Sequence, residues 1–186
     1  NTFDLLMREG GPAAYRTVAL TGGRNVARLA EMAQALRAEI AVTAFDDCLP
    51  ALRDALAGTG IAVAAGTQAV HDAADRPADW VMSAIVGAAG LVPGLVALQQ
   101  GATLALANKE SLVCCGPALI ERVRRAGGRL IPVDSEHSAI FQVFPAEAPE
   151  RVAKLILTAS GGPFRKTPRE QMVAITPEQA VAHPNW

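Results

Sequence analysis

Two acidic residues follow an apolar run in the segment Pro132-Val133-Asp134-Ser135-Glu136-His137. Side chains two residues apart point the same way in an extended chain, so Asp134 and Glu136 would converge there. Two carboxylates at close range repel each other unless a cation or a shared proton separates them. Their oxygen atoms suit Mg²⁺ or Mn²⁺, and the pattern therefore predicts part of a divalent-metal site. The alternative is a helix start, with a capping Asp134 or Ser135 and Glu136 in the first turn.

Lys109 is the first charged residue after an uncharged stretch that runs from Trp80 to Asn108. It lies where an apolar strand is expected to end and a helix to begin, next to Glu110. Ligands bind at that edge of open α/β sheets, and the N–H groups of a starting helix attract anions. The segment therefore predicts an anion site around Lys109. The alternative is a helix cap by Asn108 or Ser111, with Lys109 in solvent.

Two later segments carry candidate ligands for a phosphate. Ser160 precedes the glycine pair Gly161-Gly162, which lets the backbone come close to an anion. His183 stands three residues before Trp186, so the imidazole would contact a charged ligand and the indole would cover it. The alternatives are an ordinary turn at the glycine pair and a frayed terminus at His183.

The segment Thr21-Gly22-Gly23-Arg24-Asn25 follows the first expected strand and bears on the choice of cofactor. In dinucleotide-binding folds, an acidic residue about 20 positions past the glycine-rich turn binds the ribose 2′-hydroxyl of NAD. Arg24 stands there instead, and its guanidinium suits the 2′-phosphate of NADP. The pattern favours NADP, and the alternative is a solvated arginine beside a common turn. On this count the glycine-rich turn is expected to precede Asn1.

Apolar strands and helices alternate over residues 1–133, and these elements must position the candidate residues. Uniformly apolar strands are typical of a parallel sheet that is covered on both faces. We therefore expect an α/β fold, a doubly wound, Rossmann-like NADP-binding domain over 1–133, followed over 134–186 by the start of an α+β catalytic domain with an active-site lid. The expected strands are 16–21, 40–43, 61–64, 80–85, 103–106, 129–133 and 151–158. The expected helices are 2–8, 25–38, 46–57, 67–74, 91–99, 111–126 and 136–144, with a proline-punctuated loop over 160–186.

The composition excludes several classes of protein. The 186 residues are 51% hydrophobic with a net charge of −1, which argues against disorder and leaves no basic field for nucleic acid or an anionic membrane. Glycines and a proline interrupt the uncharged stretch, so we do not expect a membrane span. The three cysteines do not form a CxxC pattern, and the adjacent Cys114 and Cys115 are assigned to the core of a reduced, cytoplasmic protein without a signal peptide.

Five segments in this order closely resemble the 1-deoxy-D-xylulose 5-phosphate reductoisomerase family, over essentially the whole chain. Each is weak alone, but five in order are highly specific. They are 84–91 (AIVGAAGL), 108–113 (NKESLV), 132–137 (PVDSEH), 159–165 (ASGGPFR) and 183–186 (HPNW). Members of this family are NADPH- and divalent-metal-dependent enzymes of the non-mevalonate isoprenoid pathway.

The resemblance implies a role for each matching position. The positions that match NADPH contacts are Gly23, Arg24, Asn25, Asn108 and Glu110. Those that match substrate contacts are Lys109, Ser135, Glu136, Ser160, His183 and Trp186, the last as the aromatic residue of the lid. Asp134 and Glu136 match two ligands of Mg²⁺ or Mn²⁺, and Lys109 and Glu136 match catalytic positions.

The resemblance also implies a reaction and its partners. The carbon skeleton of the phosphosugar 1-deoxy-D-xylulose 5-phosphate would be rearranged, and NADPH would reduce the resulting aldehyde to 2-C-methyl-D-erythritol 4-phosphate. The full-length enzyme would be a cytoplasmic homodimer that binds neither nucleic acid nor membrane. The rival hypotheses are another NADP-dependent Rossmann reductase, with a substrate of the aspartate-semialdehyde or homoserine type, and a nucleotide-binding domain without catalysis.

Some parts of the family pattern are not matched. A third metal carboxylate and the C-terminal helical part are expected beyond Trp186, so the chain is expected to be an internal piece that is inactive alone. Ser138 stands where family members often have Asn.

Overall fold

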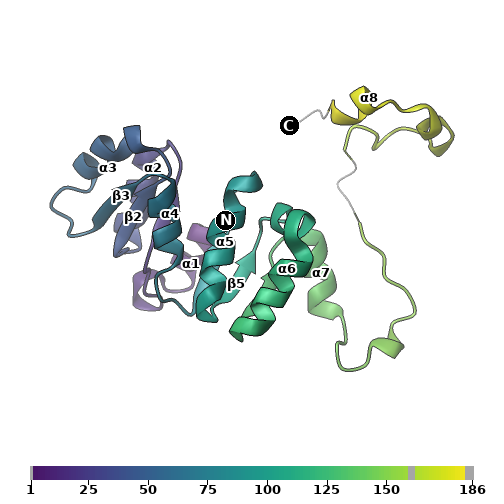
Figure 1. Cartoon of the computed structure of the whole chain (residues 1–186), viewed down its shortest axis with the longest axis horizontal. Helices are drawn as coiled ribbons and strands as arrows, with labels where there is room; N and C mark the ends of the chain where they lie inside the picture. Colours follow the sequence, from purple (N-terminus) through teal and green to yellow (C-terminus); the bar gives the residue numbers. More distant parts are fainter. Residues whose placement is uncertain (1, 159–161, 183–186) are drawn as a thin grey trace. The chain divides into compact units, whose positions relative to one another are not determined.

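The computed structural model describes residues 2–158 and 162–182 (Figure 1). The chain forms two compact units, Asn1–Asp134 and Ser135–Trp186. In the part of the chain that the structure describes, no helix is both long enough and apolar enough to cross a bilayer.

Strands and helices alternate through the first unit, as the sequence predicts. The strands are β1 (Leu20–Gly22), β2 (Ile40–Thr43), β3 (Ala62–Ala65), β4 (Trp80–Ser83), β5 (Thr103–Leu106) and β6 (Arg129–Pro132). The helices are α1 (Thr2–Arg8), α2 (Val26–Ala35), α3 (Leu49–Ala55), α4 (Thr67–Ala74), α5 (Leu91–Ala97) and α6 (Glu110–Ala126). Short 3-10 helices are η1 (Gly11–Ala13), η2 (Asp46–Cys48), η3 (Gly87–Gly90) and η4 (Leu98–Gln100).

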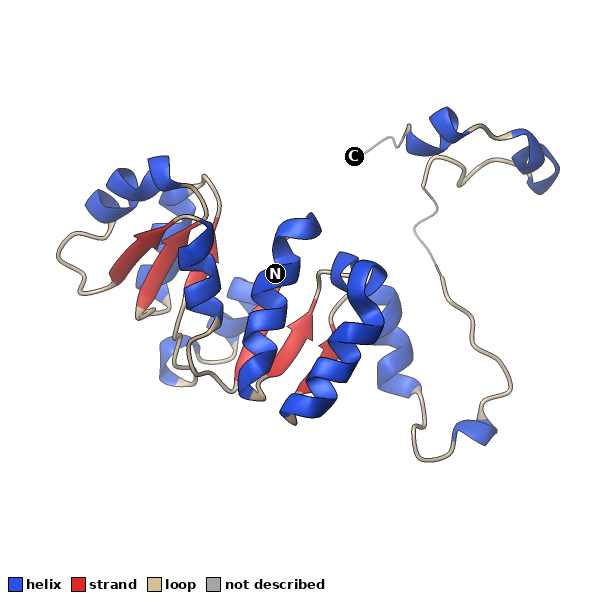
Figure 2. Cartoon of the chain, viewed as in Figure 1, coloured by secondary structure: helices blue, strands red, loops and turns tan. Residues whose placement is uncertain are grey.

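All strand pairs in the first unit are parallel, which confirms the predicted α/β class. The ladders form two three-stranded sheets, with the strand orders β1-β2-β3 and β4-β5-β6 (Figure 2). Gly22 is opposite Thr43, and Leu106 is opposite Pro132, so neighbouring strands end at the same level. The loops that follow them are therefore brought side by side.

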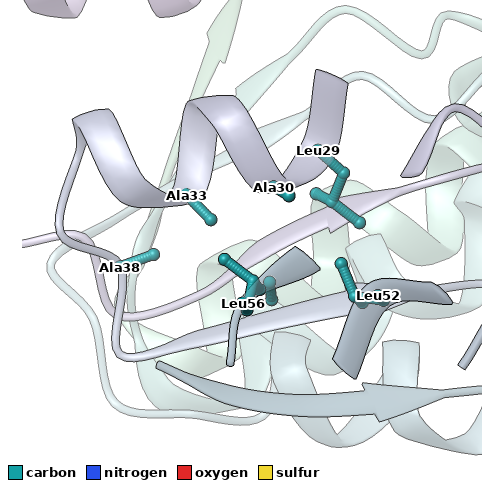
Figure 3. Packing of buried hydrophobic residues seen from close by; sticks show 7 residues of the cluster. Leu29, Ala30, Ala33, Ala38, Leu52 and Leu56 are labelled. Atoms are coloured by element: carbon teal, nitrogen blue, oxygen red, sulfur yellow. The ribbon is translucent and has the colours of Figure 1, made fainter. Parts of the chain in front are cut away.

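The first sheet is covered on both faces, which explains why β2 is apolar at successive positions. Ala41 packs into a cluster with residues of α2 and α3, among them Leu29 and Leu52 (Figure 3). Val42, the next residue, packs with Val70 of α4 on the opposite face, because successive side chains of a strand alternate. Burying a leucine or valine contributes about 1.5–3 kcal/mol, so both faces stabilise the sheet.

The second sheet is packed against α5 and α6. Leu104 and Leu106 of β5 contact Leu98 and Leu119 in one buried cluster. Helix α6 is kinked at Cys115, where φ is −137° and ψ is 22°, and Pro117 follows inside the helix. Its buried positions are Ser111, Gly116 and Leu119, so Cys114 faces away from the core and is exposed. The assignment of the cysteine pair to the core is therefore wrong for Cys114, and Cys115 is only half-buried.

The second unit contains α7 (Ser135–Val143), η5 (Pro149–Arg151), η6 (Arg169–Ala174) and α8 (Pro177–Val181). The strand predicted over 151–158 is wrong: residues 152–158 have no regular structure, and Leu155, Ile156 and Leu157 are exposed. A strand needs a neighbour for its backbone hydrogen bonds, and no strand occurs among the described residues of this unit. Within the predicted loop, α8 begins with a capping box formed by Thr176 and Gln179.

Candidate active site

The carboxyl ends of β5 and β6 bring together two candidate residues that are 25 positions apart in the sequence. Lys109 Nζ lies 3.7 Å from Asp134 Oδ2. The lysine side chain is 63% exposed, whereas the aspartate side chain is 10% exposed. The ladder extends one residue beyond β6, since Val133 N–H donates to the carbonyl oxygen of Leu106 at 2.9 Å. The arrangement therefore holds an accessible cation beside a shielded carboxylate.

Asn108, just before Lys109, is buried and makes hydrogen bonds on both sides of its amide. Its Nδ2 donates to the carbonyl oxygens of Ile85 at 2.6 Å and Gly87 at 2.9 Å. Its Oδ1 accepts from the Ser111 N–H at 3.0 Å and from the Ser111 hydroxyl. Asn108 thus caps α6 and also ties the loop after β4 to it, so the helix-cap alternative is correct for this residue.

Gly90 lies against this amide and has no room for a side chain. A Cβ at this position would lie 2.4 Å from the carbonyl oxygen of Ile85 and 2.9 Å from Asn108 Nδ2. The close approach of η3 to Asn108 therefore requires glycine at position 90.

A second candidate site lies at the carboxyl ends of β1 and β2. The Arg24 guanidinium stacks on the Phe45 ring, 4.0 Å from the centroid, and its Nη1 donates to Asp47 Oδ2 at 2.7 Å. This hydrogen bond raises the pKa of Arg24 and lowers the pKa of Asp47. Asn25 accepts from the Arg28 N–H at 3.1 Å and so caps α2. Gly23 and Arg24 therefore lie directly before the capped start of α2, and their role in cofactor binding stays a prediction.

The sequence analysis does not single out Phe45 and Asp47, the two residues that hold the Arg24 guanidinium. The signal was available, because Phe45 and Asp47 follow β2 in the same way that Arg24 follows β1. An exposed aromatic residue and an acidic residue after a buried parallel strand lie where ligands bind in such sheets.

The helix α7 begins at Ser135, so the expected extended conformation of the segment 134–136 is wrong. The Ser135 hydroxyl donates to Glu136 Oε2 at 3.0 Å in the first turn of α7, which matches the helix-start alternative. Glu136 belongs to the second unit and Asp134 to the first. Glu110 is half-buried in the first turn of α6.

The remaining candidates fall on parts of the chain that are not described. Ser160, His183 and Trp186 lie outside the described residues. Among residues 2–158 and 162–182, no cluster of three or more His, Cys, Asp or Glu side chains is arranged to hold a metal ion. The roles of Asp134 and Glu136 as metal ligands therefore stay a prediction.

Two family models match the chain. Residues 1–116 match 1-deoxy-D-xylulose 5-phosphate reductoisomerase, and residues 130–186 match the 1-deoxy-D-xylulose 5-phosphate reductoisomerase C-terminal domain. The chain belongs to the 1-deoxy-D-xylulose 5-phosphate reductoisomerase family. The resemblance inferred from the five sequence segments is thereby confirmed.

Individual relatives agree with this assignment. Proteins named 1-deoxy-D-xylulose 5-phosphate reductoisomerase from Cereibacter sphaeroides and Paracoccus denitrificans are 66% and 61% identical over all 186 residues. The matched part is 47% of the first relative and 48% of the second, so the chain spans about half the length of the curated relatives it matches.

Solved structures show the same fold. The reductoisomerase from Zymomonas mobilis in complex with NADPH is 49% identical, with a TM-score of 0.85 over 98% of this chain and 48% of that one. A reductoisomerase in complex with NADPH, fosmidomycin and magnesium is 35% identical, with a TM-score of 0.78 over 100% of this chain and 48% of that one. These matches confirm the predicted Rossmann-like α/β fold.

Proposed function

We propose that this chain supplies the NADPH-binding part and the first part of the metal and substrate site of a 1-deoxy-D-xylulose 5-phosphate reductoisomerase. The reaction would convert 1-deoxy-D-xylulose 5-phosphate into 2-C-methyl-D-erythritol 4-phosphate. Family membership supports this proposal, and the observation that carries it is the approach of Lys109 to the shielded Asp134 at one sheet edge. No observation favours a substrate of the aspartate-semialdehyde or homoserine type.

The cofactor assignment is supported by the β1–β2 edge. The Zymomonas mobilis structure contains NADPH. In this chain Arg24 has an exposed guanidinium with several N–H donors, which suits the doubly charged 2′-phosphate of NADPH. Gly23 and Asn25 would place it there, at the start of α2. Asn108 would support NADPH binding indirectly, by holding the loop after β4, because its own amide is already hydrogen-bonded to Ile85, Gly87 and Ser111. Glu110 would add a contact from the first turn of α6.

The residue types assigned to the metal and substrate site have the chemistry that a divalent metal and an anionic substrate need. Asp134 and Glu136 offer the carboxylate oxygens that Mg²⁺ and Mn²⁺ prefer. When bound, such an ion would polarise vicinal substrate oxygens as a Lewis acid. Lys109 would donate hydrogen bonds to those oxygens and stabilise negative charge that develops on them. Ser135 would contact the same substrate, and Ser160 and His183 would hold its phosphate while Trp186 covers it.

We further propose a boundary near residue 133 between the NADPH-binding domain and the start of the catalytic domain. The division into the units 1–134 and 135–186 supports a boundary in this region. We also propose that the full-length enzyme is a cytoplasmic homodimer with a small phosphosugar as its substrate.

A substitution of Lys109 tests the proposed function. In the full-length protein, Lys109→Met should lower kcat/KM at least a hundredfold, because it removes a charge-stabilising donor while keeping the length of the side chain. NADPH oxidation with the phosphorylated ketose would be measured at saturating Mg²⁺. Arg53→Ala, which removes an exposed cation from α3, is the control and should retain activity. An active Lys109→Met variant, or a wild type that does not oxidise NADPH with this ketose, would contradict the proposal.

A further inference from the structure

The proposed ligand of the 2′-phosphate, Arg24, is held by Phe45 and Asp47 of the neighbouring loop, and its Nη1 also lies 4.0 Å from Cys48 Sγ in the same segment. One face of its guanidinium lies on the Phe45 ring, and one of its Nη1 donors is taken by Asp47. Both partners follow β2, whereas Arg24 follows β1. The orientation of the arginine is therefore set by a different loop from the one that carries it.

Thr43 fixes the two loops to each other. Its side chain is fully buried, and its hydroxyl donates to the carbonyl oxygen of Gly23 at 3.1 Å. The same hydroxyl accepts from the Phe45 N–H at 3.4 Å. The Ala44 N–H also donates to the carbonyl oxygen of Gly22 at 2.9 Å. The positions of the Arg24 and Phe45 backbones thus depend on the pairing of β1 with β2 and not on a mobile contact.

Asp47 affects phosphate recognition because its carboxylate already accepts a hydrogen bond from the Arg24 guanidinium. Arginine binds phosphate best through two parallel N–H donors, and Asp47 already takes one of the Nη1 donors. A phosphate that reached the remaining donors would also approach the Asp47 carboxylate, and like charges at such distances repel. Both side chains are well exposed, at 60% for Arg24 and 66% for Asp47, so the ion pair can be exchanged for a ligand.

We propose that Asp47 is a positioning residue that sets how strongly this chain prefers a 2′-phosphorylated nucleotide. Asp47 holds Arg24 on the Phe45 ring and competes with the 2′-phosphate for the guanidinium. It therefore moderates the affinity for NADPH and leaves the affinity for a nucleotide without the 2′-phosphate unchanged. The inference rests on the proposed function, which assigns the 2′-phosphate to Arg24.

Binding of two small nucleotides to the full-length protein tests this inference. The probes are adenosine 2′,5′-bisphosphate and adenosine 5′-monophosphate, and their dissociation constants are measured by titration calorimetry at low and high salt. Asp47→Asn should bind the bisphosphate about two- to fivefold more tightly, which is the range of an exposed ion pair, and the monophosphate equally well. The gain should shrink at high salt, because salt screens exposed charges.

The neighbouring carboxylate provides a matched control. Asp46→Asn removes the same charge one residue away and leaves the ion pair of Arg24 with Asp47 in place. Weaker bisphosphate binding by Asp47→Asn, no change, or an equal gain in Asp46→Asn would overturn the inference while the proposed function stands. A wild type that binds both probes equally would instead contradict the proposed function and, with it, the inference. A melting curve of each variant verifies that it is folded.

Discussion

The two sheet edges of the first unit differ in how they expose a pair of opposite charges. At the β1–β2 edge, both Arg24 and Asp47 are open to water. At the β5–β6 edge, Lys109 is open but Asp134 is shielded. Exposed pairs contribute little and exchange partners readily, whereas a shielded carboxylate has lost part of its hydration and depends more on the groups around it. The proposed nucleotide site thus has an ion pair that is open to water on both sides, whereas the proposed metal and substrate site has one shielded member.

Near each edge, one buried polar side chain links two segments of the chain. Thr43 bridges the loops after β1 and β2, and Asn108 bridges the loop after β4 to the start of α6. Thr43 does so with one hydroxyl, whereas Asn108 uses both ends of its amide. Buried hydrogen bonds therefore fix the loops after β1 and β2 at Thr43, and the loop after β4 and the start of α6 at Asn108, where there are more of them.

The largest effect is expected from the shielded carboxylate. Asp134→Asn in the full-length protein should lower kcat at least a hundredfold and raise the Mg²⁺ concentration needed for half-maximal activity, because a charged oxygen ligand is lost beside Lys109. A Mg²⁺ titration of NADPH oxidation measures both quantities. An unchanged requirement for Mg²⁺ would refute the proposed ligand role and remove the distinction between the edges.

A smaller effect is expected from the buried polar side chains. Asn108→Ala should destabilise the protein by about 2–4 kcal/mol, because the carbonyls of Ile85 and Gly87 lose their donor and α6 loses its cap. Thr43→Val keeps the shape of the side chain and should cost about 1–2 kcal/mol. Urea unfolding of the two variants compares them. Equal costs would show that the two edges are tied equally firmly.

The smallest effect concerns the titration of the exposed pair. The hydrogen bond from Arg24 lowers the pKa of Asp47 from its ordinary value of 3.8. A carboxyl group with a lowered pKa in the folded state stabilises the fold above its unfolded pKa, and this contribution is lost as the pH falls through the folded pKa. The contribution of Asp47 should therefore be present at neutral pH and disappear below about pH 4.

Arg24→Ala isolates this titration. The variant should move the Asp47 titration upward, towards the ordinary value, as followed by carboxyl carbon NMR between pH 2 and 6. Arg28→Ala leaves the ion pair of Arg24 in place and is the control. A titration of Asp47 that is the same in wild type and Arg24→Ala would show that the two groups are not paired in solution.

Much of the fold could be predicted because the beginnings and ends of several helices and strands are visible in the sequence. The predicted elements at 40–43, 67–74 and 103–106 match β2, α4 and β5 residue for residue. The two strands are short, mainly apolar runs that lie between segments with helical patterns, so their type is visible in the sequence. Residues 151–158 have the same apolar character, but a strand also needs a partner, and composition does not report one.

The candidate sites could be predicted only in part, for a different reason. Lys109 and Asp134 end neighbouring parallel strands, so strand order alone suggests that they meet. The contact of Arg24 with Asp47 depends on the register of β1 with β2 and on the hydrogen bonds of Thr43 with Gly23 and Phe45. Residue spacing in the sequence reveals neither of them. For Asn108 the sequence analysis offers a helix cap and a binding residue as alternatives. The structure shows that the residue caps α6 and also holds the loop after β4, so the two alternatives do not exclude each other.

The lack of space for a side chain at position 90 limits which substitutions of Gly90 the fold can accept. Even alanine would push η3 off the Asn108 amide, since its methyl carbon would meet the Ile85 carbonyl and the amide nitrogen at once. In a library covering every residue of the chain, position 90 should therefore tolerate no replacement, although it carries out no chemistry itself. Glycine at position 90 thereby preserves the position of Asn108, the residue that directly precedes Lys109.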